Sequence, residues 1–368
     1  MKILRVSSEL YPYSIGGIAL HVYDLSNVQS EMGNDVTIYT CLPRTTIKID
    51  DTPPYSIVNF GRRFVLAGNP LCINLFFSLL KNYSKSDIIH AHSHLFISTL
   101  ICAIVHRVKK FNLVITNHGL VSQAVPFWFQ NLYLNTCGRF IFSSADALIT
   151  YTKEEKATLV NLGIDSEKIH VIHNGIKVER FLTILDVPKK KQILWIGRYV
   201  PGKGAEYLVK GFGLFSQLHP EYSLLMIGNG PDKESIIQQI DDLALSDKIS
   251  MVDFIPNEKL QVVYAESEIF ISASLAEGVP KTILEAMVCG LSVISTDLPQ
   301  LVDIVEGCGI IIPCRDPSAI CHALEQITTD PQFMAQCGEN GRNKVLSNYD
   351  WCDTVKKTNE LFTELISS

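Results

Sequence analysis

Short apolar runs alternate with amphipathic stretches along almost the whole chain. In the first half the runs KILRVSS, DVTIYT, DIIHAH, LVITNHG and ALITYT are rich in β-branched residues and predict strands. Helix-like stretches separate most of them. Between the first two runs, apolar side chains recur with helical spacing up to Gly33, which fits a helix end. Alternation of strands and helices predicts an α/β fold with a parallel sheet covered on both faces.

The pattern pauses at VIHNGIKVERF and the polar run DVPKKKQ, and then it restarts. The runs ILWIGR, SLLMIG, ISMVDF, IFISAS, LSVIST and GIIIP predict a second set of strands, and residues 349–366 are helix-like. We therefore predict two Rossmann-like domains that face each other across a cleft, with the boundary near Gly175. Ligands of open α/β sheets bind beyond the carboxyl ends of the strands, so the residues that follow each strand are the candidates for function.

Length and composition agree with this picture. A chain of 368 residues exceeds the size at which one core usually stops growing, which favours two domains. The net charge of −6 argues against nucleic acid as a partner, because phosphate-backbone binding needs a basic surface. The ten cysteines show no Cys-x-x-Cys spacing, which favours buried, unpaired thiols in a reducing compartment. The apolar window Phe64–Leu80 is interrupted by glycine, proline and asparagine, so no spanning helix is predicted.

Two features of the first half could carry chemistry. Gly16 and Gly17 precede a predicted helix, where backbone N–H groups could meet an anion, although an ordinary strand–helix turn fits equally well. His118 follows a predicted strand and could donate to a hydroxyl or transfer a proton, or it could make a structural hydrogen bond. The alternating His90, His92 and His94 have no carboxylate or cysteine close in sequence, which favours a structural role over metal binding.

In the second half, Arg198 and Lys203 lie on a loop between a predicted strand and helix. Two cations beside a helix start suit a diphosphate, and the paired Gly202 and Gly204 would let the backbone approach it. Two solvated loop charges are the alternative. The glycines favour the anion site.

The stretch EGVPKTILEA, residues 277–286, predicts a helix start. Pro280 suits the first helical position, which leaves the N–H groups of Lys281 and Thr282 available to an anion. Glu277 precedes the helix, where it could accept hydrogen bonds from sugar hydroxyls or complement the helix dipole. Glu285 lies in a largely apolar turn, where a carboxylate needs a partner such as a ribose diol.

Taken together, these motifs resemble those of the retaining glycosyltransferases of family 4, which have the two-domain GT-B architecture. The similarity runs through GGIALHVYDLSNVQSEMGNDVTIYT, DIIHAHS, VITNHG, KIHVIHNGIKVERF, ILWIGRYVPGKG and EGVPKTILEAM, and the last of these is the most specific element. The resemblance implies that the closing helix returns to the first domain. The expected domains are therefore 1–175 with 350–368, on the acceptor side, and 176–349, which binds the donor.

The resemblance also implies a function and the roles of the site residues. The donor would be a nucleotide-diphosphate sugar, with UDP or GDP as its nucleotide, and the acceptor a glycan, a lipid-linked sugar or a small molecule. His118 and Glu277 would act at the transferred sugar, and the other residues would bind the donor: Gly16, Gly17, Arg198, Lys203, Lys281, Thr282 and Glu285. No cofactor and no metal are expected, because cations and a helix N-terminus can stabilise the departing diphosphate.

Two departures from the family pattern are present. Pro280 replaces the glycine found in many members and removes one N–H donor, and the stretch STDLPQLVDIV lacks the usual glycine pair and glutamate. Two other functions share the fold, namely a nucleotide-sugar epimerase and a non-catalytic member that binds a nucleotide or a partner. A Rossmann oxidoreductase is disfavoured because G-x-G-x-x-G is missing.

The remaining expectations concern location. The stretch VPFWFQNLYL, residues 125–134, carries four aromatic residues and is either a partly exposed core helix or a surface that rests on lipid. We expect a cytoplasmic protein with reversible, peripheral contact at the cytoplasmic face of a membrane, and no binding of nucleic acid.

Overall fold

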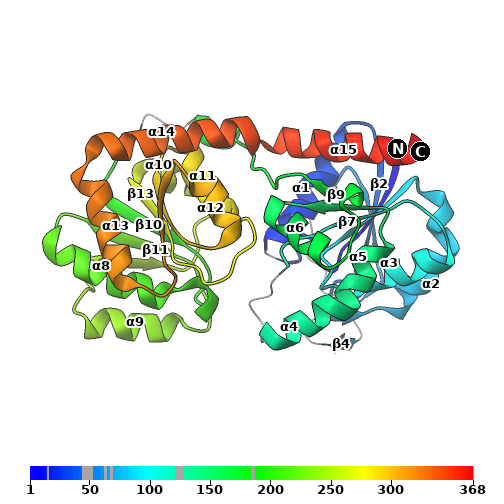
Figure 1. Cartoon of the computed structure of the whole chain (residues 1–368), viewed down its shortest axis with the longest axis horizontal. Helices are drawn as coiled ribbons and strands as arrows, with labels where there is room; N and C mark the ends of the chain where they lie inside the picture. The colour runs from blue at the N-terminus through cyan, green and yellow to red at the C-terminus, as the bar shows by residue number, and fades with distance from the viewer. Residues whose placement is uncertain are drawn as a thin grey trace. The chain divides into compact units, whose positions relative to one another are not determined.

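The computed structural model describes residues 1–14, 16–43, 53–61, 64–66, 69–120, 127–183 and 187–367. Contacts between residues divide the chain into two compact α/β units (Figure 1). Unit 1 comprises Met1–His173 and Thr354–Ser368, and unit 2 comprises Asn174–Asp353. Val125 and Pro126 of the predicted aromatic stretch, and Asp186 of the predicted linker, lie outside the described residues.

Unit 1 is built on a seven-stranded parallel sheet in the order β3-β2-β1-β6-β7-β8-β9. Its strands are β1 (Lys2–Val6), β2 (Asp35–Thr40), β3 (Ser56–Asn59), β6 (Ile88–His92), β7 (Leu113–Thr116), β8 (Ala147–Thr150) and β9 (Ile169–Val171). A separate antiparallel pair is formed by β4 (Phe64–Leu66) and β5 (Asn69–Leu71). The α-helices are α1 (Gly17–Glu31), α2 (Ile73–Asn82), α3 (Ile97–Val108), α4 (Phe127–Tyr133), α5 (Arg139–Ser144), α6 (Lys153–Asn161) and most of α15 (Trp351–Ser367).

Unit 2 is built on a six-stranded parallel sheet in the order β12-β11-β10-β13-β14-β15. Its strands are β10 (Gln192–Ile196), β11 (Ser223–Ile227), β12 (Ile249–Val252), β13 (Ile269–Ser272), β14 (Ser292–Thr296) and β15 (Gly309–Ile312). The helices are α7 (Glu179–Leu182), the 3₁₀ turn η4 (Pro201–Lys203), α8 (Ala205–Leu218), α9 (Lys233–Asp242), α10 (Asn257–Glu266), α11 (Lys281–Val288), α12 (Pro299–Val305), α13 (Pro317–Thr329) and α14 (Pro331–Asn348).

Burial of both sheet faces explains the apolar runs of the sequence. All residues of β6, β7, β8, β13 and β14 are buried, as expected for parallel strands covered by helices on both sides. Each unit holds two clusters of buried apolar side chains. Among the described residues, no helix combines the length and hydropathy that crossing a membrane requires.

Strand order reverses direction at one point in each sheet. In unit 1 the reversal lies between β1 and β6, and in unit 2 it lies between β10 and β13. Such a switch point opens a crevice at the carboxyl ends of the two strands, and this is where open α/β sheets bind their ligands. The loops after β1, β6, β10 and β13 are therefore the ones positioned for function.

Some details differ from the sequence-based expectations. Strands β3, β4, β5 and β9 were not predicted, because their runs are short and lie near sheet edges or in a hairpin. The tail is not helical from residue 349, since Tyr349 and Asp350 separate α14 from α15 and pair with Ile176. This pairing also assigns Trp351 to unit 2 rather than to the first domain. Cys41 and Cys72 lie side by side, with their Cα atoms 6.5 Å apart, and the other eight cysteines are free, as expected.

Candidate functional site

The loops that follow β10 and β13 meet through an ion pair in unit 2. Nζ of Lys203, in η4, contacts Oε1 of Glu277, and the exposed fractions of these side chains are only 19% and 10%. The Ser274 hydroxyl donates a hydrogen bond of 2.7 Å to the same carboxylate oxygen. A residue predicted to bind the donor, Lys203, and one predicted to act at the transferred sugar, Glu277, are thus brought together at the switch point of the sheet.

Gly204 permits this close approach. Its backbone is left-handed, with φ of 65°, and an added Cβ would lie 2.0 Å from the carbonyl oxygen of Ala273. Beside it, the N–H of Leu275 donates to the carbonyl of Gly202 at 2.9 Å. A side chain at position 204 would push the two loops apart, so the prediction of close backbone approach here has a steric basis.

Helix α11 begins one residue later than predicted. Pro280 is its cap, with an extended ψ of 120°, and Lys281 is the first helical residue. The first-turn N–H groups of a helix have no partner within the helix, so the amides of Lys281 and Thr282 start the helix as expected. The ammonium group of Lys281 lies 5.1 Å from the ring centre of Trp351, which directs that side chain toward the start of α15.

Glu285 lies one turn inside α11 and is held by a tyrosine. The hydroxyl of Tyr264 donates a hydrogen bond of 2.8 Å to its Oε2. Burial raises the pKa of Glu285, while this hydrogen bond and the charges of Lys281 and Arg180 act in the opposite direction. The buried carboxylate predicted to need a partner therefore has one in Tyr264, which the sequence analysis did not identify.

Arg198 differs from these residues. Its side chain is exposed and makes no hydrogen bond or ion pair to any other residue in the described part of the chain. Its position two residues after β10 is the predicted one. The structure therefore joins Lys203 to Glu277 and places Lys281 near Glu285, whereas the side chain of Arg198 bonds to none of these residues.

In unit 1, Gly16 and Gly17 form the start of α1. Gly16 is the cap, and Gly17 is the first helical residue and is exposed. An added Cβ would meet no described atom within 4 Å at Gly17, and at Gly16 only Oε2 of Glu9 at 3.8 Å. Neither position requires glycine for the fold of the described residues.

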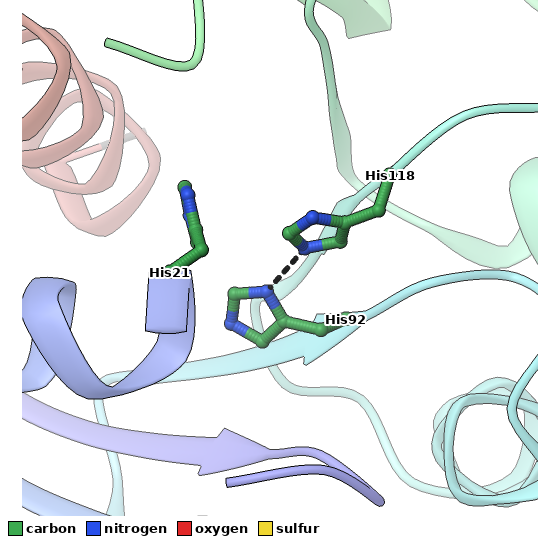
Figure 2. A group of neighbouring side chains, drawn as sticks. All are labelled: His21, His92 and His118. Carbon is green, nitrogen blue, oxygen red and sulfur yellow. Dashed lines mark hydrogen bonds between the residues drawn. The ribbon is translucent and has the colours of Figure 1, made fainter. Parts of the chain in front are cut away.

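His118 lies two residues beyond β7 and is held between two side chains. Its Nε2 lies 3.0 Å from Nδ1 of His92 (Figure 2). Its Nδ1 lies 2.9 Å from the hydroxyl of Tyr151. The ring of His21, on α1, lies 5.0 Å from that of His118 between centroids. His21, His92 and Tyr151 therefore surround the predicted catalytic histidine.

The three alternating histidines separate into two roles. His90 bonds Thr116 at 2.7 Å and His94 bonds Asn117 at 2.9 Å, both in buried positions, which supports the predicted structural role. His92 instead contacts His118 directly. The sequence could not show this, because the contact follows from the pairing of β6 with β7, in which His92 lies opposite Thr116.

A buried arginine lies beside these histidines and helps to keep them neutral. Arg5 on β1 bonds the hydroxyl of Ser26 and the amide of Gln29, and burial lowers its pKa to about 9. Its Nη2 lies 3.4 Å from Nδ1 of His90. Loss of hydration and nearby positive charges hold the pKa values of His90 and His92 well below the usual range, so both rings are neutral at pH 7.

Comparison with known families divides the chain in the same way as its fold. Residues 15–180 match the model of Glycosyltransferase Family 4, and residues 182–344 match that of Glycosyl transferases group 1. Among curated proteins, an uncharacterised glycosyltransferase of Methanocaldococcus jannaschii is 24% identical over 96% of each chain. One subunit of the human phosphatidylinositol N-acetylglucosaminyltransferase is 26% identical, and its alignment covers 98% of this chain and 75% of its own.

Solved structures show the same fold. The sucrose-phosphate synthase of Thermosynechococcus elongatus superposes with a TM-score of 0.82 at 21% identity, covering 100% of this chain and 99% of that one. Anabaena HepE, solved with UDP and glucose, gives a TM-score of 0.80 at 17% identity, covering 99% of both chains. The motifs, the two units and these similarities agree, and the chain belongs to the family 4-like glycosyltransferases with the GT-B fold.

Proposed function

We propose that this glycosyltransferase moves a hexose from a nucleotide-diphosphate sugar to a lipid-linked or glycan acceptor, with retention and without a metal ion. The observation that carries the donor assignment is the Lys203–Glu277 ion pair beside the start of α11. An ammonium group, helix N–H groups and the exposed Arg198 supply the positive partners that a diphosphate needs. HepE, with the same fold, was solved with UDP and glucose, which makes uridine nucleotides the first donors to test.

The ion pair suggests how the donor binds. A diphosphate beside η4 would take Lys203 as its counterion, and Glu277 would then be released to accept hydrogen bonds from sugar hydroxyls. Glu277 keeps the hydrogen bond from Ser274 during this exchange, so its carboxylate stays in place. Glu285, held by Tyr264, would bind the ribose hydroxyls. Lys203 and Glu277 would thus exchange each other for partners on the ligand, which limits the cost of their desolvation.

The transfer step follows from stabilisation of the leaving group. The bond between the anomeric carbon and the phosphate oxygen breaks, and the acceptor oxygen bonds to the same face of that carbon. The departing phosphate oxygen takes the acceptor proton, which preserves the balance of charge. Lys203, Arg198 and the amides of α11 would stabilise the negative charge that develops on the diphosphate. The two ring nitrogens of His118 bond His92 and Tyr151, and one of these partners would be exchanged for a hydroxyl of the transferred sugar.

Exposed aromatic residues support a lipid-linked acceptor. On α4, Trp128 is 68% exposed, and Phe129 and Leu132 are also exposed, whereas Tyr133 turns inward and donates to the carbonyl of His94 at 2.8 Å. Arg139 lies exposed at the start of α5. Apolar side chains next to a cation suit peripheral binding to an anionic membrane surface. The relatives that act on phosphatidylinositol are consistent with such an acceptor.

Binding and product analysis test this proposal. Thermal unfolding with UDP, GDP and ADP should show a raised midpoint for one nucleotide, because a ligand that binds only the folded state stabilises it. With the matching sugar donor, NMR should find the product with the anomeric configuration of the donor, at the same rate after treatment with EDTA. Conversion of the donor without an acceptor would instead indicate an epimerase, and binding without turnover would indicate a non-catalytic member.

A further inference from the structure

Three histidines of unit 1 converge at one point. His21 comes from α1, His92 from the end of β6 and His118 from the loop after β7 (Figure 2). Each ring offers a nitrogen atom, and these atoms lie within 4.8 Å of one another. In the described part of the chain, this is the one group of three or more histidine, cysteine, aspartate or glutamate residues with such spacing. The convergence was not visible in the sequence, since the three residues lie in separate segments.

The kinds of atoms define which ion would fit. Imidazole nitrogen suits zinc, copper, nickel and cobalt, whereas magnesium and calcium prefer oxygen. Zinc bonds to histidine nitrogen are about 2.0–2.1 Å long, so tetrahedral ligands lie roughly 3.3 Å apart. The facing nitrogens of His92 and His118 are already 3.0 Å apart. We propose that His21, His92 and His118 form a binding site for a divalent ion of the zinc class, with a fourth position open to water.

The ring protons can rearrange so that the ion replaces the hydrogen bond between His92 and His118 and both imidazole rings stay neutral. One proton now bridges Nδ1 of His92 and Nε2 of His118. If the ion takes these two atoms, the proton moves to the other nitrogen of the ring that carries it. His118 can then donate from Nδ1 to the Tyr151 hydroxyl, 2.9 Å away, which can accept as well as donate. Such an outer partner is typical of histidines that bind metals, because it fixes the tautomer.

Two features of the surroundings weaken the site. His92 is fully buried, and its Nε2 has no hydrogen-bond partner among the described residues, so with an ion on Nδ1 this nitrogen would carry the ring proton without an acceptor. Arg5 lies behind His90, whose ring centre is 4.2 Å from that of His92, and its positive charge weakens the binding of a cation. We therefore expect an exchangeable ion rather than a permanently bound structural one.

The site has a consequence for activity, which rests on the proposed function. His118 is the residue that would hydrogen-bond the transferred sugar, and an ion on its Nε2 would draw the ring away from that role. Zinc should therefore inhibit transfer, and a chelator should restore it. The binding of the ion does not depend on whether the chain transfers a sugar.

Cobalt absorption provides the direct test. The full chain, without a histidine tag and with the exposed Cys137 and Cys352 changed to serine, is titrated with Co²⁺ alone. We expect visible d–d bands that saturate at one equivalent and disappear on addition of Zn²⁺. His21→Gln should weaken Co²⁺ binding at least roughly tenfold. His322→Gln, on the exposed face of α13, should bind as the parent does.

The outcomes separate the site from the proposed function. Equal Co²⁺ binding by His21→Gln and His322→Gln, or no saturable bands in the parent, would overturn the site. If His92→Gln fails to fold, His21→Gln still tests the site. Circular dichroism checks that this variant is folded, and the rise in its thermal midpoint with Zn²⁺ gives a second measure of binding. Metal binding in a chain that never transfers sugar would leave the site intact and refute the proposed function. If Zn²⁺ binds but the rate of sugar transfer stays the same, only the proposed inhibition is refuted.

Discussion

The hydroxyl of Tyr264 donates a hydrogen bond of 2.8 Å to Oε2 of Glu285, and this contact joins α10 to α11. It has a counterpart elsewhere in unit 2, where the hydroxyl of Tyr222 donates to Oε2 of Glu268 at 2.7 Å. The two pairs have the same chemistry, but only Glu285 lies in the candidate donor site. Together they allow the functional effect of a tyrosine–glutamate bond to be separated from its structural effect.

Tyr264→Phe should weaken nucleotide binding. Without the hydroxyl, the carboxylate of Glu285 loses a hydrogen-bond donor, its pKa rises further, and it is less well held for a ribose. A net loss of about 1 kcal/mol, or roughly fivefold in affinity, is expected. Tyr222→Phe should cost similar stability and leave affinity unchanged. Calorimetric titration with the nucleotide measures the affinity of both variants. Equal affinities would contradict the role of Tyr264.

Lys203→Ala should reduce donor turnover much more than Lys190→Ala. Both lysines form ion pairs in unit 2, but Lys190 pairs with Glu266 at 2.6 Å before β10, away from the strand ends that bear the candidate site. Loss of a cation that stabilises the leaving group should lower kcat/KM roughly 100-fold. An exposed ion pair contributes little, so Lys190→Ala should change the rate less than about twofold. Steady-state kinetics that fail to distinguish the variants would refute the assignment of Lys203.

Gly204→Ala tests whether close loop contact positions the site. Gly204 and Gly307 both have positive φ, at 65° and 74°, but only at Gly204 would a Cβ strike the backbone, at Ala273. Gly307→Ala should cost about 1–2 kcal/mol from its left-handed backbone alone. Gly204→Ala should cost more and should also lower donor affinity. The free energy of unfolding of both variants is measured by chemical denaturation. Equal values would contradict the role of the contact between Gly204 and Ala273.

The fold was largely predictable because both sheets are buried on both faces. Parallel strands of this kind appear in the sequence as apolar runs, and those of β1, β2, β6–β8 and β10–β15 were identified. Edge strand β3 has an exposed, polar pattern and was missed for that reason. The order of strands was not predictable from alternation alone, so neither was the switch point that joins the loops after β10 and β13.

The site was predictable as a set of strand-end residues, but not as a set of contacts. Lys203 and Glu277 were identified separately, and their ion pair follows from the adjacency of β10 and β13. His92 and His21 were not identified as neighbours of His118, because their approach depends on sheet register and on the placement of α1. Tyr264 could not be selected as a site residue from the sequence, because an aromatic residue in a helix usually belongs to the core.

Substitution of exposed apolar residues on α4 should weaken membrane binding. Trp128→Ser with Leu132→Ser removes two side chains that are 68% and 56% exposed. Burial of such side chains contributes about 1.5–3 kcal/mol each, so even partial insertion predicts at least roughly tenfold weaker binding. Phe254→Ser, at a side chain 70% exposed in unit 2, is the control. Co-sedimentation with anionic vesicles at low salt is the assay, and equal binding by all three proteins would exclude α4.

Glu155 should make unit 1 less stable as the pH rises. Its carboxylate accepts from the N–H of Tyr151 at 2.9 Å and from Asn117 at 3.4 Å, yet burial raises its pKa from 4.5 to about 7. Between these values the folded state holds a proton that the unfolded state has lost, so the free energy of unfolding falls with increasing pH. At about 1.4 kcal/mol for each pH unit, the window corresponds to about 3 kcal/mol.

A difference measurement isolates this effect from other titrating groups. Burial lowers the pKa of His94 to about 4, and this acts in the opposite direction, because the unfolded state then binds the extra proton below pH 6.5. Urea unfolding of the wild type and Glu155→Gln at about pH 5 and about pH 8 cancels the shared histidine contribution. The wild type should lose more stability than the variant between these two pH values, whereas Glu167→Gln, at an exposed position, should follow the wild type. Parallel curves for all three proteins would show that Glu155 is already ionised in the folded state at about pH 5.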